Sequence, residues 1–399
     1  MPPSDAPHRY QSLDVLRGFA LLGILVMNIQ AFAMVAAAYV NPTLAGPFEG
    51  VDFALWLVSH VLAEYKFLSL FAALFGAGIV MMARSSEAAG VDPWLRHRRR
   101  MVLLGLIGLL HATFIWYGDI LFLYAVVGLV AFRFREMPVA TLLRWALALY
   151  LVPLMAGLLF TLALMDMPAD EYQQLVRDMW APGAAALQEE ISAYRGRYWQ
   201  QLGQRVETLM GGYLLMILLE EGWRTLALML AGMAAYRSGL ITGEWPLRRY
   251  RHLALACFAL GVPVILLGVA FNQSHGWEMR FAVYLGRAFN GLAAPLVALG
   301  WACAVLTAWR RGYWPSLMAR LSALGRMALT GYLLTSVLCT SVFYGFGLGL
   351  FERLERPGQW LVMVAVWALL LFLAPLWLRH FRQGPVEWLW RRGVYGRSV

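Results

Sequence analysis

Two apolar stretches carry side chains that could perform acid–base or acyl-transfer chemistry. His111 and Asp119 lie in the first, and a histidine beside a carboxylate is the usual equipment for general base or nucleophilic catalysis. Glu220 and Arg224 lie in the second, where Glu221 pairs with Arg224 at i, i+3 and leaves Glu220 as the freer carboxylate. We predict that His111, Asp119, Glu220 and Arg224 are catalytic. In that case His111 is the base or acyl acceptor, and Arg224 stabilises charge on the substrate oxygen. The alternative is a buried cluster that only fixes helix packing.

The first apolar stretch of the chain holds a second polar set, Asp14, Arg17 and Asn28. Asp14 and Arg17 are spaced i, i+3, so the carboxylate can neutralise the guanidinium while part of the fork remains for an anion. Asn28 would lie at membrane depth and needs a protein partner or a wet cavity. We predict that this set binds an acyl donor. Alternatively, it is a first span with an interfacial basic flank and polar contacts to its neighbours.

A third set is predicted to bind substrate: His60, Glu64, Lys66, Arg287 and Asn290. His60 and Glu64 are spaced i, i+4 and Lys66 follows directly, so these three could instead form a self-neutralising trio at the membrane interface. Arg287 has no acid within four positions. It must therefore find a carboxylate on another helix or bind an anionic group.

Composition places these residues in a membrane protein. Of 399 residues, 61% are hydrophobic and 14% are charged, against about 25% charged in an ordinary soluble domain. The net charge of +10 comes almost entirely from arginines, which flank apolar segments as they do in cytoplasmic loops. Residues 84–100 and 310–326 are accordingly predicted to be two such basic loops. This pattern indicates contact with acidic lipid headgroups and argues against nucleic acid. The basic cluster that ends at Arg100 could alternatively dock an anionic cytosolic donor such as a CoA thioester.

The three cysteines, Cys257, Cys303 and Cys339, lie inside apolar stretches without metal-like spacing. Neither a disulfide nor a metal site is predicted. No covalently bound cofactor is expected either, although an acyl-CoA or similar donor would bind reversibly. The sequence is compatible with an oligomer and with a small-molecule or lipid substrate.

Span lengths predict an all-α, polytopic helical bundle. We expect about ten transmembrane helices with short re-entrant or interfacial segments, in a single transmembrane domain over residues 1–399. The run 53–83 would be a helix of about 47 Å, too long for one straight crossing, and should break near residues 64–66. The run 101–134 is expected to be a hairpin that turns at Gly118 and Asp119 and is recessed below the outer surface. Residues 166–207 should form an outer amphipathic segment with one helix along the surface, and residues 379–399 a cytoplasmic interfacial tail.

Several motifs resemble those of the YeiB-like bacterial inner-membrane proteins, an uncharacterised family. They include FLSLFAALFGAG, GLLHATFIWYGDIL, GRMALTGYLLTS, FYGFGLGLF and PLWLRHFRQGPVEWLW. The opening pattern Leu13-Asp14-x-x-Arg17-Gly18-x-Ala20, with Asn28 beyond it, also resembles the first helix of heparan-alpha-glucosaminide N-acetyltransferase. In that enzyme a histidine soon after the shared Asn is taken as the acetyl carrier, whereas residues 31–52 of this chain contain none.

The resemblance implies an integral protein of the bacterial inner membrane, and the arginine distribution predicts that both termini are cytoplasmic. It also implies a transmembrane acyltransferase that moves an acyl group from a cytosolic, acyl-CoA-like donor to an acceptor on the outer side. The alternative is a transporter or flippase for a lipid or small anionic metabolite, in which the same charges line a path. A third class is a receptor or scaffold that uses the outer segment 166–207.

Overall fold

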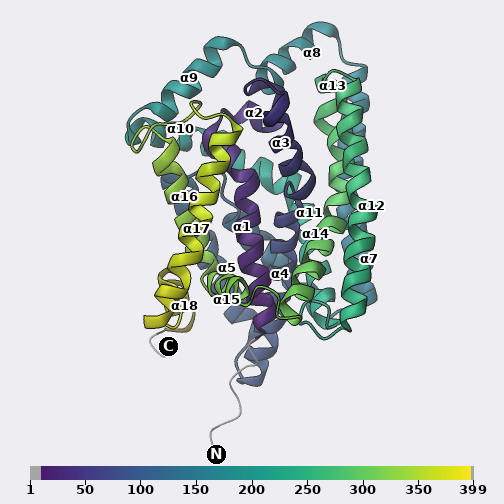
Figure 1. Ribbon diagram of the computed structural model, residues 1–399, viewed down its shortest axis with the longest axis vertical. Coiled ribbons are helices and arrows are strands. Elements are labelled where there is room, and N and C mark those ends of the chain that lie inside the picture. Colours follow the sequence, from purple (N-terminus) through teal and green to yellow (C-terminus); the bar gives the residue numbers. More distant parts are fainter. Residues whose placement is uncertain (1–9, 397–399) are drawn as a thin grey trace, which may run out of the picture.

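A computed structural model describes residues 10–396, and in this part of the chain all regular structure is helical (Figure 1). The first half contains α1 (Gln11–Ala33), α2 (Ala36–Val40), η1 (Pro42–Leu44), α3 (Gly50–Leu62), α4 (Lys66–Ala88), α5 (Pro93–Phe114), α6 (Leu121–Ala131), η2 (Phe132–Phe134), α7 (Val139–Met165), α8 (Ala169–Leu175), η3 (Val176–Trp180) and α9 (Ala184–Arg195). The second half contains α10 (Tyr198–Met210), α11 (Tyr213–Arg237), α12 (Leu247–Ser274), α13 (Met279–Phe281), η4 (Ala282–Gly286), α14 (Arg287–Arg310), α15 (Pro315–Arg326), α16 (Ala328–Phe343), α17 (Arg356–His380) and α18 (Pro385–Tyr395).

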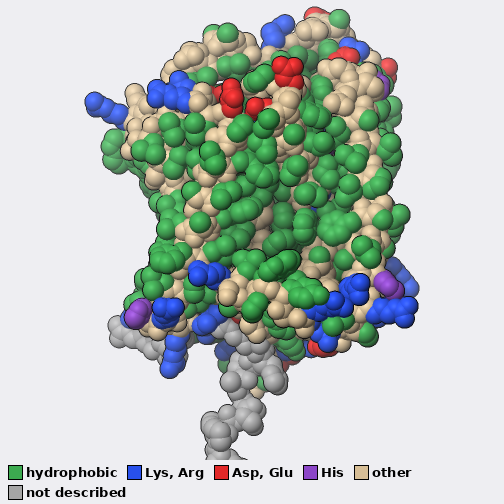
Figure 2. Space-filling view, viewed as in Figure 1, with side chains coloured by type: hydrophobic (Ala, Val, Ile, Leu, Met, Phe, Trp, Pro, Cys, Tyr) green, Lys and Arg blue, Asp and Glu red, His purple; other side chains and the backbone are tan. Residues whose placement is uncertain are grey.

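The helices form one upright bundle with α1 near its centre (Figure 1). Both described chain ends lie at its lower end, which we call the terminal end, and α8, α9 and α10 cover the opposite end. Figure 2 shows a broad apolar band between the two ends, with mostly basic side chains below it and both acidic and basic ones above. A wide apolar belt of this kind suits the hydrocarbon core of a bilayer.

Within residues 10–396, six helices or helix pairs are long and apolar enough to cross a membrane, or seven if the bent pair α15–α16 counts as one span. The fold class, a polytopic helical membrane bundle, is thereby confirmed. The remaining predicted spans, which correspond to α5, α6, α11 and α16, are helices too. However, α5 and α11 carry several charged residues, and α6 and α16 have only 11 and 16 residues. The count of ten spans stays a prediction.

The two length-based predictions of local structure are confirmed. The long second run breaks between α3 and α4, where Tyr65 takes a left-handed backbone conformation with φ of 64°. The hairpin turns between α5 and α6 at residues 115–120. Its tip is covered by α10, because Arg205 Nε donates to the carbonyl of Thr113 (3.0 Å) and the Tyr198 hydroxyl donates to that of Phe114 (2.9 Å).

Three segments differ from their predicted form. Most of the expected 84–100 loop is helical, because α5 starts early with Asp92 as its cap (Oδ1 to Trp94 N, 2.9 Å) and Pro93 in its first turn. The expected 310–326 loop contains α15, which meets α16 at 90°. The single surface helix expected within 166–207 is instead α9 and α10. The Gln201 amide holds their junction by donating to the carbonyls of Tyr194 and Gly196, both at 2.9 Å.

Close backbone contact fixes α1 against α15 at the terminal end. A Cβ on Gly18 would lie 2.0 Å from the carbonyl oxygen of Leu321, and one on Gly325 would lie 1.8 Å from that of Asp14. Only glycine permits this approach, as at other tight helix crossings in membranes. The crossing places Arg17 and Arg326 near each other, and both line the cavity described next.

Candidate functional site

A cavity of about 260 Å³ lies at the terminal end of the bundle and is called the basic cavity. Its charged lining residues are three arginines and one carboxylate, with His97 beside them: Arg17, Arg100, Arg326 and Glu387. Glu387 also accepts hydrogen bonds from the backbone N–H groups of Leu329 (2.7 Å) and Thr330 (3.0 Å), so this carboxylate caps α16. The remaining excess of positive charge suits an anionic ligand.

A second cavity, of about 360 Å³, lies toward the opposite end and is called the tyrosine cavity. Its aromatic lining comprises Tyr39, Tyr65, Trp116, Tyr117, Tyr124 and Tyr213. Its charged lining comprises three carboxylates and two guanidinium groups: Asp119, Glu220, Glu221, Arg224 and Arg287. The two cavities therefore carry charges of opposite sign.

A thin partition separates the two cavities. Tyr124 lines both of them, while Leu121 faces the basic cavity and Leu123 the tyrosine cavity. Tyr332 lines the basic cavity, and its hydroxyl accepts from Ile120 N (3.3 Å) in the loop that borders the tyrosine cavity. The start of α6 and Tyr332 thus form a wall about one side chain thick.

His111 is buried inside this wall, with 1% of its surface exposed. Its Nδ1 lies 2.8 Å from Asp119 Oδ2, and Asp119 Oδ1 accepts from Phe122 N at 2.8 Å. Gly108, one turn earlier on the same face of α5, permits this approach, because a Cβ there would lie 2.6 Å from Asp119 Oδ1. The ring centroid of His111 lies 5.1 Å from that of Tyr332. His111 Nε2 has no hydrogen-bond partner among the described residues.

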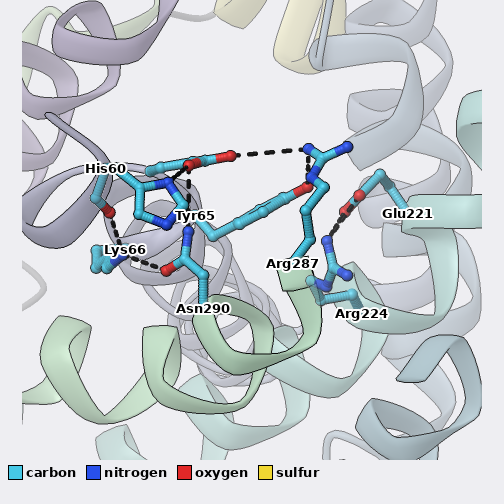
Figure 3. Close-up of polar contacts among 8 residues, drawn as sticks. His60, Tyr65, Lys66, Glu221, Arg224, Arg287 and Asn290 are labelled. Carbon is cyan, nitrogen blue, oxygen red and sulfur yellow. Dashed lines mark hydrogen bonds and ion pairs between the residues drawn. The ribbon is translucent and has the colours of Figure 1, made fainter. Parts of the chain in front are cut away.

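The predicted substrate-binding residues form a buried network at the α3–α4 break (Figure 3). His60 Nδ1 is hydrogen-bonded to Glu64, and Asn290 Nδ2 donates to the same carboxylate at 3.2 Å. Lys66, which is fully buried, donates to the carbonyl of His60 (2.6 Å) and to Asn290 Oδ1. The two oxygens that accept hydrogen bonds from its Nζ offset part of the cost of burying this polar group.

Tyr65 connects this network to the tyrosine cavity. Arg287 donates to the Tyr65 hydroxyl at 2.6 Å and lies 3.7 Å from Glu64. Arg224 lies over the Tyr65 ring, 4.6 Å from its centroid, and donates to both carboxylate oxygens of Glu221 at 2.7 and 2.8 Å. Figure 3 shows this series of side-chain contacts, which runs from His60 across Tyr65 to the Arg224–Glu221 pair. Both arginines of the tyrosine cavity are thus already paired.

The structure groups the predicted site residues differently from the sequence. Asp119, Glu220 and Arg224 line one cavity, as the catalytic hypothesis requires, while His111 lies behind Asp119. Asp14 and Arg17 pair at 3.2 Å, but Asn28 lines the tyrosine cavity and not the basic one.

Of the predicted substrate set, only Arg287 lines a cavity; His60, Glu64, Lys66 and Asn290 do not. Arg287 meets its acid on another helix, as its sequence neighbourhood required.

Sequence reasoning missed the residues that shape the cavities. Tyr124 and Tyr332 stand in ordinary apolar runs, and nothing in the sequence sets them apart from core aromatics. Arg326 and Trp390 come from α15 and α18, whose folding back against α1 and α5 has no sequence signal. Trp390 Nε1 donates to the carbonyl of Arg100 at 3.1 Å, so a contact across most of the chain closes the basic cavity.

The fold and its two cavities define the class: a polytopic helical membrane protein with polar sites buried in the bundle. A family model described as "Protein of unknown function (DUF418)" matches residues 235–397. The chain is 36% identical to the uncharacterised protein YeiB of Escherichia coli strain K12, over 96% of each chain. It therefore belongs to the YeiB-like family.

Two further relatives extend the similarity to other bacteria. The uncharacterised protein YxaH of Bacillus subtilis strain 168 is 28% identical over 99% of this chain and 96% of its own. An uncharacterised 39.9 kDa protein from the amylase 3′ region of Bacillus acidopullulyticus is 24% identical over 100% and 97%. No solved structure matches the chain.

Proposed function

We propose that this protein is a transmembrane acyltransferase of the bacterial inner membrane. Both termini would lie in the cytoplasm, so that the basic cavity opens to cytosolic donors and the tyrosine cavity to acceptors on the outer side. The concentration of arginines at the terminal end supports this orientation, because cytoplasmic flanks are rich in Lys and Arg. An anionic thioester such as an acyl-CoA suits the basic cavity.

One observation carries the proposal: two cavities of opposite charge share a thin wall that contains a buried histidine. A single transported solute would have to fit both charge environments in turn. Two different ligands, one in each cavity, fit them without conflict. A group small enough to cross the wall could then pass between them.

His111 is the residue positioned to carry that group. Its Nε2 lone pair would attack the donor carbonyl carbon, and the carbon–sulfur bond would break as the thiolate leaves on the donor side. The acceptor nucleophile would then bond to the acyl carbon as the acyl–nitrogen bond breaks, and its proton would pass to the imidazole. Asp119, bound to Nδ1, keeps the ring oriented in both steps. Because His111 lines neither cavity, Tyr332 would have to move aside for the donor in the basic cavity and Trp116 for the acceptor in the tyrosine cavity.

The test uses full-length protein in nanodiscs with radiolabelled acetyl-CoA and extracted bacterial lipid as acceptor. We expect label on the protein and in the lipid extract, and His111→Ala should lower transfer roughly a hundredfold or more while CoA still binds. His252→Ala, an exposed histidine outside both cavities, is the matched control. If His111→Ala only lowers thermal stability and transfer per folded molecule is unchanged, His111 is a packing residue.

A transporter or flippase is the second candidate, and the α3–α4 break favours it. Discontinuous helices at mid-membrane polar sites are common in secondary transporters. Here the break presents Tyr65, and through it Arg287, to the tyrosine cavity. Vesicle uptake of an unmodified labelled anion that persists in His111→Ala would favour this candidate over acyl transfer.

A further inference from the structure

The charged groups that line the tyrosine cavity do not balance. Arg224 is bound to Glu221, and Arg287 to the Tyr65 hydroxyl and Glu64. Glu220 lines the same cavity, is exposed, and makes no hydrogen bond or ion pair with any residue that the structure describes. One carboxylate of the lining therefore has no cation of its own.

Asp119 does not supply the missing positive charge. Its two oxygens accept from His111 and from the backbone of Phe122. With His111 protonated the pair is neutral, and with His111 neutral Asp119 adds a further negative charge. In the second state three carboxylates face two guanidinium groups and the lining is net negative, whereas in the first state the charges of the lining and His111 balance. In both states Glu220 has no direct partner among the described residues, so a cationic ligand is favoured beside it.

The aromatic rings that line the same cavity as Glu220 favour an organic cation over a metal ion. Tyr213 and Glu220 lie two helical turns apart on one face of α11, about 10 Å along its axis. Tyr117 faces Tyr213 with ring centroids 5.4 Å apart, and both rings line the cavity. Tyrosine faces attract organic ammonium ions, as they do in the aromatic cages that bind quaternary amines.

The cavity already contains this type of contact in the protein itself. Two guanidinium groups lie over the Tyr65 ring, with centroid distances of 4.6 Å for Arg224 and 5.7 Å for Arg287. The Tyr65 ring is therefore taken, whereas no arginine or lysine of the described residues lies over the Tyr117 or Tyr213 ring, each of which pairs with other aromatic rings. The rings of Tyr117 and Tyr213 therefore remain for an organic cation bound in the same cavity as Glu220.

We propose that the tyrosine cavity binds an organic ammonium ion, with Glu220 as its counter-charge and Tyr117 and Tyr213 as its aromatic walls. The inference deepens the proposed function, since the ammonium-bearing molecule would be the acceptor. It rests on that function only for this role, because ammonium binding needs neither donor nor turnover.

The test compares two probes of nearly the same shape, choline and its uncharged analogue 3,3-dimethylbutanol. Binding to full-length protein in nanodiscs is measured by calorimetry without any acyl donor. We expect choline to bind at least tenfold tighter, and Glu220→Gln to remove this preference. Glu207→Gln changes an exposed carboxylate outside the cavity and should keep it.

A second variant covers the case in which Glu220→Gln does not fold. Tyr213→Leu keeps an apolar side chain but removes the ring, and should lower the choline preference several-fold. Equal binding of the two probes by the parent protein, or an unchanged preference in both folded variants, would overturn the inference. Choline binding that follows these expectations in a protein without acyl transfer would support the ammonium site and refute the proposed function alone.

Discussion

The basic cavity and the tyrosine cavity are built from shared helices yet have opposite chemistry. Both use α1, α4 and α6, and both include Tyr124. They differ in the elements that complete them. The basic cavity is completed by α5 and α15, which bring Arg100 and Arg326, and by α16 and α18. The tyrosine cavity is completed by α2, the 115–120 loop, α14 and the first half of α11, which bring most of its tyrosines and acids. The comparison shows that most of the charge that distinguishes the two cavities comes from elements that they do not share, with Arg17 of α1 as the exception.

The largest expected effect comes from reversing a charge in the basic cavity, which should remove the difference in charge between the two cavities. Arg100→Glu changes the local charge by two units beside Arg17 and Arg326, and we expect roughly a hundredfold weaker binding of coenzyme A. Choline binding in the tyrosine cavity should not change. Calorimetry with each probe measures both, and Arg248→Glu, an exposed arginine outside the cavities, is the control. Equal losses for Arg100→Glu and Arg248→Glu would show that only the overall charge matters.

Arg17→Lys should have a smaller effect on ligand binding in the basic cavity and tests the geometry of the site separately from its charge. The charge is kept, but the planar fork that contacts Asp14 and faces the cavity is lost. Coenzyme A binding should weaken about tenfold, in line with the loss of one charge-assisted hydrogen bond. If the Lys variant binds coenzyme A with the parent's affinity and has the same thermal stability, Arg17 contributes only its positive charge.

The smallest expected effect concerns pH and the end of the bundle that holds the tyrosine cavity. Glu190 on α9 accepts from Ala36 N at 2.9 Å, next to that cavity. Burial raises the pKa of Glu190, and the nearby Glu352 carboxylate raises it further, against the effect of the Ala36 N–H.

Because this pKa is higher in the folded than in the unfolded protein, the stability contributed by Glu190 is fully present below the ordinary glutamate pKa. It is lost as the pH rises through the raised value. Glu190→Gln does not titrate, so its melting temperature should fall less than that of the parent over this pH range. The exposed neighbour Glu189 gives the control variant, Glu189→Gln. Parallel melting curves for parent and Glu190→Gln would contradict the assignment.

Local features of the site followed from the sequence. The break beside Tyr65 and the hairpin that joins His111 to Asp119 were predicted, because bilayer thickness limits the length of a straight span. The Asp14–Arg17 and Glu221–Arg224 pairs were predicted as well, because residues three apart face each other on a helix.

Contacts between helices that are far apart in the sequence could not be predicted from it. Lys66 meets Asn290, and Arg287 meets Tyr65, across more than half of the chain, and each helix offers several faces to its neighbours. The sequence showed that Arg287 needed an acid but could not say which one. The contact of Trp390 with Arg100, 290 positions apart, has no local sequence pattern either.

The position of Glu387 has a consequence for how the protein is made. This residue caps α16 and, with Trp390, borders the basic cavity, yet both are synthesised after α17. During translation the earlier helices can insert while α16 still has an uncapped start and the cavity an unfinished wall. The basic cavity is therefore assembled last, so a nascent or prematurely terminated chain would be inserted with this cavity incomplete.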